Sequence, residues 1–134
     1  MARAVLDTNV IVSACLTPEG APATIVELAL LGVFTFCISR EVLAEYREVL
    51  GRPKFSRQSE RIKAVLEGIV EISEMITPES SLTISPDEQD NRLLECALAC
   101  KADMLVTGNQ KHFPDRLGNT RVVSPREFLI ELGF

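Results

Sequence analysis

The sequence has no long apolar run of the kind that crosses a membrane. No stretch of about 18 apolar residues occurs. No apolar signal core follows Met1 and Arg3, because a short strand-like run begins at once. We therefore expect a cytoplasmic protein without a membrane partner. The chain also lacks internal repeats, low-complexity tracts and Gly-rich nucleotide-binding loops.

Residue types that bind zinc are scarce. The four cysteines include no CxxC pair, and His112 is the only histidine. Cys96 and Cys100 lie one helical turn apart, but His112 alone does not complete a zinc site. All four cysteines lie in apolar stretches, so we expect them to be small core residues.

A net positive charge is absent as well. Nineteen acidic and fourteen basic residues give a net charge of −5, which argues against a protein that coats nucleic acid nonspecifically. A metal-dependent nuclease is not excluded, because divalent ions offset the charge of its carboxylates before a phosphate arrives. One basic cluster could guide a nucleic-acid strand or form a solvated helix face. It consists of Arg47, Arg52, Lys54, Arg57, Arg61 and Lys63.

The 134 residues, of which 46% are apolar, suffice for one globular domain spanning residues 1–134. Predicted strands alternate with predicted helices, which indicates an α/β fold with a mainly parallel sheet covered on both faces. We expect strands at 4–6, 33–38, 104–106 and 121–123, and helices at 10–16, 22–31, 41–50, 57–74, 86–101 and after 124. The segment 75–84 is a connector with room for a brief edge strand, and 110–118 is a loop or short helix.

Asp7 follows directly after the opening strand, Ala4 to Leu6. If that strand is a central parallel one, Asp7 stands at the sheet edge where open α/β folds bind ligands. A structural role is the alternative, since Asp7 or Asn9 could instead cap the next helix. Three later features favour the first interpretation.

The first two features are carboxylates on predicted helices. Glu45 lies at the edge of the apolar face of helix 41–50, so it is either a boundary residue or a carboxylate that reaches into a cleft. Asp90 lies near the centre of an apolar helix face, where a charge is costly unless a positive group meets it. With Ser85 as N-cap, the helix start accounts for Asp87 but not for Asp90. Asp90 could bond to the preceding connector, but we favour a functional carboxylate.

The third feature is the polar turn after strand 104–106, which contains Thr107 and Asn109. Together with Asp7, Glu45 and Asp90, this turn could reach one cleft at the carboxyl edge of the sheet. Oxygen ligands without paired histidine or cysteine suit Mg²⁺ or Mn²⁺ better than zinc or copper. Such a site is typical of phosphate chemistry.

These segments resemble the motifs of PIN domains, in order and over nearly the whole chain. Residues 6–10 resemble the opening motif, and residues 39–46 resemble the second, with Glu45 at its acidic position. Residues 87–97 resemble the third motif, which includes Asp90, and residues 102–109 resemble the fourth. The most similar subgroup is that of VapC-type toxins from prokaryotic toxin-antitoxin pairs.

The resemblance implies a three-layer α/β/α PIN-like fold, metal-dependent endoribonuclease activity, homodimerisation and a cognate antitoxin protein. By the same resemblance, Asp7, Glu45 and Asp90 would bind one or two Mg²⁺ or Mn²⁺ ions. Thr107 and Asn9 would hold ligands or water in place. Water activated at the metal would attack the RNA phosphate in line.

Asn109 departs from the family pattern, because many PIN domains carry an acid there. An amide oxygen is a weaker, neutral ligand, so a second metal would bind weakly or only with substrate. Asp115, or Asp87 near the mouth of the cleft, could compensate. We expect His112 to be a loop or phosphate-contact residue rather than a ligand.

Three other functions share part of this pattern. A haloacid-dehalogenase-type phosphatase needs a second aspartate two residues after Asp7, where this chain has Asn9. A receiver domain would use Asp7, Thr107 and a lysine near Lys111, but it needs its phosphoacceptor on a middle strand, and neither 33–38 nor 104–106 ends in aspartate. The stronger alternative is a PIN-like domain without activity that binds RNA or a protein, which Asn109 and the acidic balance both permit.

Overall fold

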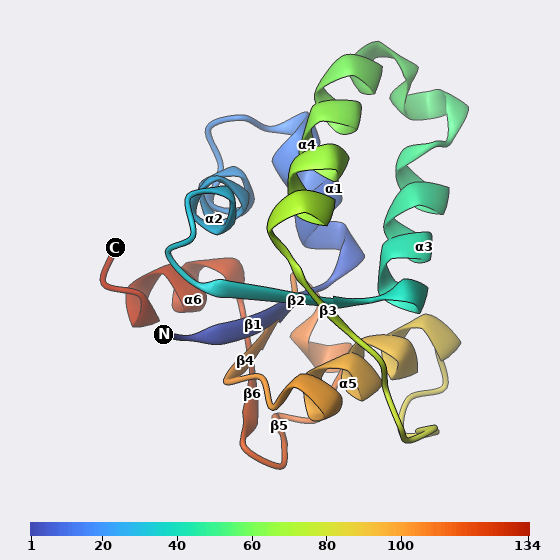
Figure 1. Ribbon diagram of the computed structural model, residues 1–134, viewed down its shortest axis with the longest axis vertical. Coiled ribbons are helices and arrows are strands. Elements are labelled where there is room, and N and C mark those ends of the chain that lie inside the picture. Colours follow the sequence, from blue (N-terminus) through green and yellow to red (C-terminus); the bar gives the residue numbers. More distant parts are fainter.

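A computed structural model describes all 134 residues as one sheet with helices on both faces (Figure 1). The sheet has six strands in the order β3-β2-β1-β4-β6-β5. Every neighbouring pair is parallel except β5 with β6, so the predicted mainly parallel sheet is confirmed. The strands are β1 (Arg3–Leu6), β2 (Thr35–Ser39), β3 (Glu74–Ile76), β4 (Met104–Val106), β5 (Arg116–Leu117) and β6 (Thr120–Val123).

The helices form the two outer layers. Helices α1 to α4 pack together on one face of the sheet, and α5 covers the other face against β1, β2 and β4 (Figure 1). No helix combines the length and apolar character that a bilayer crossing requires. The helices are α1 (Thr8–Leu16), α2 (Ala21–Leu30), α3 (Arg40–Leu50), α4 (Ser59–Ile72), α5 (Glu88–Cys100) and α6 (Pro125–Glu131), with the 3₁₀ helices η1 (Pro53–Gln58) and η2 (Gln110–His112).

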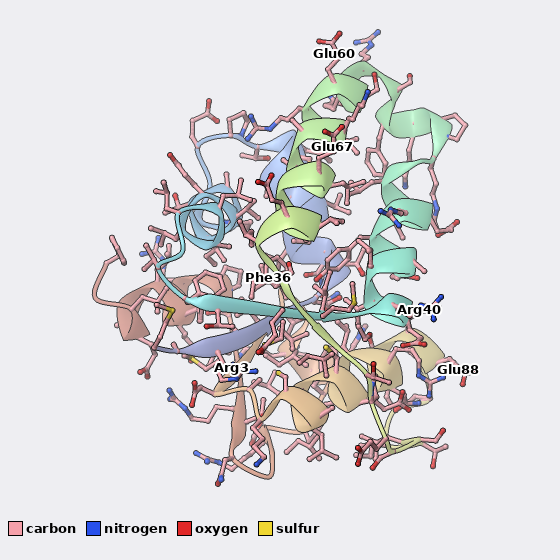
Figure 2. All side chains as sticks on the ribbon, viewed as in Figure 1. Arg3, Phe36, Arg40, Glu60, Glu67 and Glu88 are labelled. Atoms are coloured by element: carbon pink, nitrogen blue, oxygen red, sulfur yellow. The ribbon has the colours of Figure 1, made fainter.

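The buried apolar side chains form one cluster between these layers. Phe36 is a residue of β2 on the side of the sheet that helices α1 to α4 cover (Figure 2). Its ring centre lies 6.5 Å from that of Tyr46 on α3. Phe34 meets Phe128 of α6 edge to face at 4.9 Å, an arrangement that aromatic rings favour. The four cysteines are buried and unpaired, as predicted.

Strand β1 is the turning point of the sheet. From β1 the chain moves outward through β2 to β3, and then crosses to β4 on the other side of β1. Connections that diverge in this way leave a crevice at the carboxyl ends of the two central strands. Leu6 pairs with Val106 at these ends. Asp7 and Thr107, the residues that follow, therefore meet at the crevice.

Some elements differ from the predictions. The helix predicted from residue 57 begins at Ser59, because residues 53–58 form a 3₁₀ helix whose tighter repeat departs from the α-helical pattern. The segment predicted as a loop or short helix at 110–118 also contains β5, which pairs with β6 through a turn with Gly118 at φ +58°.

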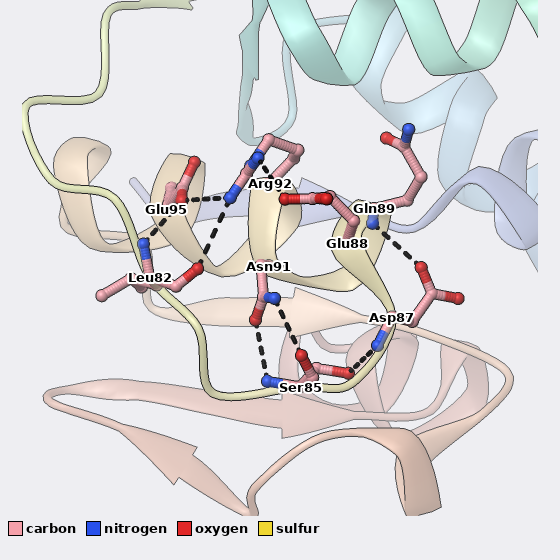
Figure 3. Close-up of polar contacts among 8 residues, drawn as sticks. All are labelled: Leu82, Ser85, Asp87, Glu88, Gln89, Asn91, Arg92 and Glu95. Carbon is pink, nitrogen blue, oxygen red and sulfur yellow. Dashed lines mark hydrogen bonds and ion pairs between the residues drawn. The ribbon is translucent and has the colours of Figure 1, made fainter.

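The N-cap of α5 is Asp87, not Ser85. The Asp87 carboxylate accepts the N–H of Gln89 at 2.9 Å, and the Ser85 hydroxyl accepts the N–H of Asp87 at 3.1 Å. The side-chain amide of Asn91 holds the Ser85 backbone outside the helix, with bonds of 2.8 Å to both its N–H and its carbonyl (Figure 3). Helix α5 therefore starts at Glu88, two residues later than predicted.

Candidate functional site

A cleft of about 440 Å³ opens at the carboxyl ends of β1 and β4. Its walls come from the start of α1, from α3, from η1, from the start of α5 and from the turn after β4. Six of the seven predicted site residues line it, and the seventh, Thr107, lies behind it against Asp7. The six are Asp7, Asn9, Glu45, Asp87, Asp90 and Asn109.

Asp7 stands between β1 and α1, at the position of a helix N-cap. Its side chain makes no capping hydrogen bond. Instead, its Oδ2 accepts the Thr107 hydroxyl at 2.7 Å and the Asn9 side-chain amide at 3.3 Å. Burial raises the pKa of Asp7, while the Thr107 hydroxyl and the N–H groups of Asn9 and Thr8 act in the opposite direction. Capping therefore does not account for this carboxylate.

Thr107 holds Asp7 from within the protein, since none of its surface is exposed. While its hydroxyl donates to Asp7, its Oγ1 accepts the N–H of Asn109 at 3.0 Å. Asn9 makes a parallel connection, because its Oδ1 accepts the N–H of Gly108 at 3.2 Å and its amide donates to Asp7. The turn after β4 and the start of α1 are thus joined through one carboxylate.

Asp90 reaches the cleft from the first turn of α5 and is only 8% exposed, which confirms its predicted burial. Its Oδ2 is buried and has no hydrogen-bond partner, and His112 Nδ1 lies 4.0 Å from it. Burial raises the pKa of Asp90 to about 6, and the carboxylates of Asp87 and Asp7 act in the same direction. A buried polar atom without a partner destabilises a fold. His112 and the Ser85 hydroxyl favour the charged carboxylate and offset part of this cost, but no hydrogen bond reaches Oδ2.

Glu45 comes from the middle of α3 and is half-buried. The adjacent Tyr46 is fully buried, and its hydroxyl donates to the Leu6 carbonyl, which anchors α3 beside the end of β1. Burial and the nearby Glu48 carboxylate raise the pKa of Glu45, and Arg52 opposes them. Glu45 therefore lines the same cleft as Asp7 and belongs to its electrostatic environment.

Asp87 and Asn109 are exposed residues at the mouth of the cleft. Asp87 is already engaged in capping α5 through its bond to Gln89. Asn109 brings a neutral amide to the mouth. Asp115 does not line the cleft, so it does not supply the acid that Asn109 lacks.

Comparison with known proteins bears on this arrangement. A family model described as "PIN domain" matches residues 3–111. The chain belongs to the PIN domain family. The matched range contains every residue predicted for the site, which confirms the resemblance found in the sequence motifs.

This PIN domain is similar to one protein in sequence and to two solved structures in fold, all at low sequence identity. It is 27% identical to the uncharacterized protein MJ1680 of Methanocaldococcus jannaschii, over 96% of this chain and 90% of that protein. A chain of VapBC2 from Rickettsia felis, solved bound to a DNA fragment from the promoter, superposes with a TM-score of 0.63 at 24% identity, over 91% of this chain and 98% of that one. The PIN domain of T. brucei RRP44 gives a TM-score of 0.50 at 14% identity, over 97% and 80%. These likenesses confirm the PIN-like α/β fold.

The side chains of this PIN domain fit a hard divalent cation. Asp7, Glu45 and Asp90 offer only oxygen atoms, which suits Mg²⁺ or Mn²⁺. The Oδ2 atom of Asp90 has no hydrogen-bond partner, so it is free to bind a metal ion. No three acidic, histidine or cysteine side chains lie close enough together to surround an ion by themselves. Water and substrate oxygens would therefore complete the coordination, as is common for Mg²⁺.

Sequence reasoning missed side chains in and beside the cleft. Phe55 lines the cleft from η1, a short 3₁₀ segment without the periodicity that locates helices. The adjacent Lys54, which the sequence indicated only as part of a basic cluster, lines the cleft as well. Asn91 and Glu95 tie the preceding connector to α5, and Glu95 accepts the N–H of Leu82 at 2.7 Å (Figure 3). Their spacing of four residues on one helix face was the signal available in the sequence.

Proposed function

We propose that this PIN domain is a divalent-metal-dependent endoribonuclease, with Asp7, Glu45 and Asp90 as its metal ligands. The observation that carries the proposal is the buried, unpartnered Oδ2 of Asp90. It shares a cleft with Asp7 and Glu45, whose pKa values are also raised by burial. Carboxylates grouped in this way destabilise a protein unless a cation compensates them. A bound divalent cation would offset the repulsion among these carboxylates.

Each side chain has a role that its contacts support. A bound Mg²⁺ or Mn²⁺ would stabilise charge on the phosphate and lower the pKa of a bound water. Thr107 and Asn9 hold Asp7 in one orientation, so this carboxylate needs little reorganisation when it acts as a ligand. Asn109 adds no charge at the mouth of the cleft, which leaves fewer anionic ligands for a second ion.

In its biological setting, we propose that the chain is the toxin of a toxin-antitoxin pair, acts as a homodimer and is neutralised by a cognate antitoxin. The shared fold with a VapBC2 chain and the VapC-like motifs support this role. A neighbouring gene for a small protein that copurifies with the chain and blocks RNA cleavage is the expected finding. A neighbouring product that neither binds the chain nor changes its activity would argue against the role.

A second candidate is a PIN-like module without activity that binds RNA or a protein. Asn109 favours it, because many PIN domains carry an acid at this position. The spacing of the acids also favours it, since no three of them enclose an ion unaided. Such a module would bind its partner equally well with and without divalent metal.

Cleavage of a labelled single-stranded RNA tests the proposal. We expect cleavage with Mn²⁺ or Mg²⁺, none with EDTA, and a loss of about 100-fold or more in Asp7→Asn and in Asp90→Asn, because a metal ligand is weakened. Glu41→Gln, which removes an exposed acid of α3 outside the cleft, should keep full activity. Equal cutting by a repurified Asp7→Asn/Asp90→Asn variant would assign the activity to a contaminant. Metal-independent RNA binding without any cleavage would favour the second candidate.

A further inference from the structure

A second concave surface adjoins the cleft. It is a groove of about 750 Å³ between α3 and α4, which are joined at one end through η1 (Figure 1). The groove has an apolar floor, and its rim carries charged side chains and the hydroxyls of Ser56 and Ser59. The floor consists of Leu50, Phe55, Ile62, Leu66 and Val70.

The groove and the cleft meet at η1. Phe55 lines both of them. Lys54 lines the cleft, where its ammonium lies 5.2 Å from the centre of the Phe55 ring. Lys54 takes part in none of the ion pairs of the chain, although four carboxylates line the same cleft. A strand that leaves the cleft at this end would pass Lys54 and enter the groove.

The charge of this region is opposite to that of the whole molecule. Residues 47–63 contain six basic and two acidic side chains, whereas the rest of the chain contains eight basic and seventeen acidic ones. Arg52 is paired with Glu48 at 2.8 Å. Arg47 and Lys63 are exposed, line the groove and make no ion pair. Three cations without an ion pair therefore line the two surfaces, Arg47 and Lys63 the groove and Lys54 the cleft.

Acidic groups mark the other end of the groove. Glu67 and Glu71 line it further along α4, and Figure 2 shows Glu67 well below Glu60, which stands at the η1 end of the helix. Arg61 does not contribute, because it donates to the Ala14 carbonyl on α1, away from the groove. The basic half of the groove is thus the half that is continuous with the cleft.

We propose that this basic half binds the single-stranded RNA that flanks the cleavage point, with Arg47, Lys54 and Lys63 contacting its phosphates. The identification of the bound strand as the substrate RNA rests on the proposed nuclease function. A single strand presents unpaired bases to an apolar floor and phosphates to a basic rim, which a duplex does not. The continuity with a cleft suited to phosphate chemistry favours RNA over a peptide, because a peptide has no phosphate to place there.

RNA binding without cleavage tests this inference separately from the nuclease function. The host is the full-length Asp7→Asn/Asp90→Asn variant in EDTA, where neither metal nor cleavage contributes. The probe is a fluorescein-labelled single-stranded RNA of twelve nucleotides, read by anisotropy over a series of KCl concentrations. Lys54→Gln/Lys63→Gln is compared with Lys101→Gln/Arg116→Gln, which removes the same charge from exposed positions outside the cleft and the groove.

We expect the Lys54→Gln/Lys63→Gln change to weaken binding about tenfold and to reduce the slope of log Kd against log salt by about 1.4, or about 0.7 for each phosphate that the protein no longer neutralises. The Lys101→Gln/Arg116→Gln change should alter the affinity and the salt slope by less than about a third of these amounts. Equal effects of the two double substitutions, or no RNA binding by the host variant, would overturn the inference. If RNA binding follows this pattern but the wild-type chain fails to cut RNA, that result would refute the proposed nuclease function and support the proposed RNA binding in the groove.

Discussion

The Thr107 hydroxyl donates a 2.7 Å hydrogen bond to the carboxylate of Asp7, which lies 100 positions earlier in the chain. The two residues meet because β1 and β4 are adjacent parallel strands, with Leu6 paired to Val106. The same hydroxyl oxygen accepts the N–H of Asn109. The orientation of Asp7 therefore depends on the turn after β4, and Thr107 acts as a positioning residue.

Thr107→Val tests this dependence, because it keeps the shape of the side chain and removes the hydroxyl. Asp7 loses a donor and the N–H of Asn109 loses its acceptor, so we expect a loss of about 1–3 kcal/mol in unfolding free energy. Affinity for Mn²⁺ should fall about tenfold, as for other residues that orient metal ligands. Thermal unfolding and a Mn²⁺ titration measure the two effects. Thr107→Ser keeps the hydroxyl, so its unfolding free energy and Mn²⁺ affinity should be close to those of the wild-type chain. Unchanged Mn²⁺ affinity in Thr107→Val would refute the positioning role.

The raised pKa of Asp90 predicts how the metal-free protein responds to pH. The carboxyl has a pKa of about 6 in the folded chain, against an ordinary value of 3.8, so between these values the folded state binds the proton more tightly. Its contribution to stability is complete below the lower value and is lost as the pH rises through the upper one. Asp7 and Glu45, whose pKa values burial also raises, act with the same sign.

Urea denaturation in EDTA at several pH values between about 4 and 7 measures this effect. Asp90→Asn should be more stable than the wild-type chain at pH 7 and should show a shallower decline as the pH rises. Added Mn²⁺ should stabilise the wild-type chain more at pH 7 than at pH 5, because the cation competes with the proton. A decline of equal slope in wild type and Asp90→Asn would show that this carboxyl is not the titrating group.

Asn109 should limit how tightly a metal is held. Asn109→Asp restores an acid at the mouth of the cleft, so we expect Mn²⁺ affinity to rise about tenfold or a second ion to bind. The same substitution at Asn119, an exposed residue between β5 and β6, is the matched control and should have no such effect. Calorimetry reports both affinity and stoichiometry. A gain of equal size in the two variants would reflect net charge alone.

Periodicity located Asp90 correctly, because one charge on an apolar helix face stands out against a 3.6-residue repeat. The same reasoning placed the start of α5 two residues early, since Ser85 and Asp87 are both good caps. The choice between them depends on the amide of Asn91, a tertiary contact to the connector. A periodic signal needs several turns, so the two-residue strand β5 and the 3₁₀ helix η1 left no trace in the pattern.

The cleft itself could be anticipated only in part. That Asp7 and Thr107 end two strands was readable from the sequence, but their contact depends on β1 and β4 being neighbours in the sheet. Glu45 was ambiguous for a similar reason. Its position follows from Tyr46, whose hydroxyl bonds to the Leu6 carbonyl across the core, and no local pattern encodes that bond.

Calorimetric titration of Mn²⁺ into the repurified chain tests most directly whether the carboxylates of Asp7, Glu45 and Asp90 together hold a divalent cation. We predict a saturable site in the wild-type chain that disappears in each of Asp7→Asn, Glu45→Gln and Asp90→Asn, and persists in Glu41→Gln, whose carboxylate lies outside the cleft. The same Mn²⁺ isotherm in the wild-type chain and in Asp90→Asn would contradict a shared site.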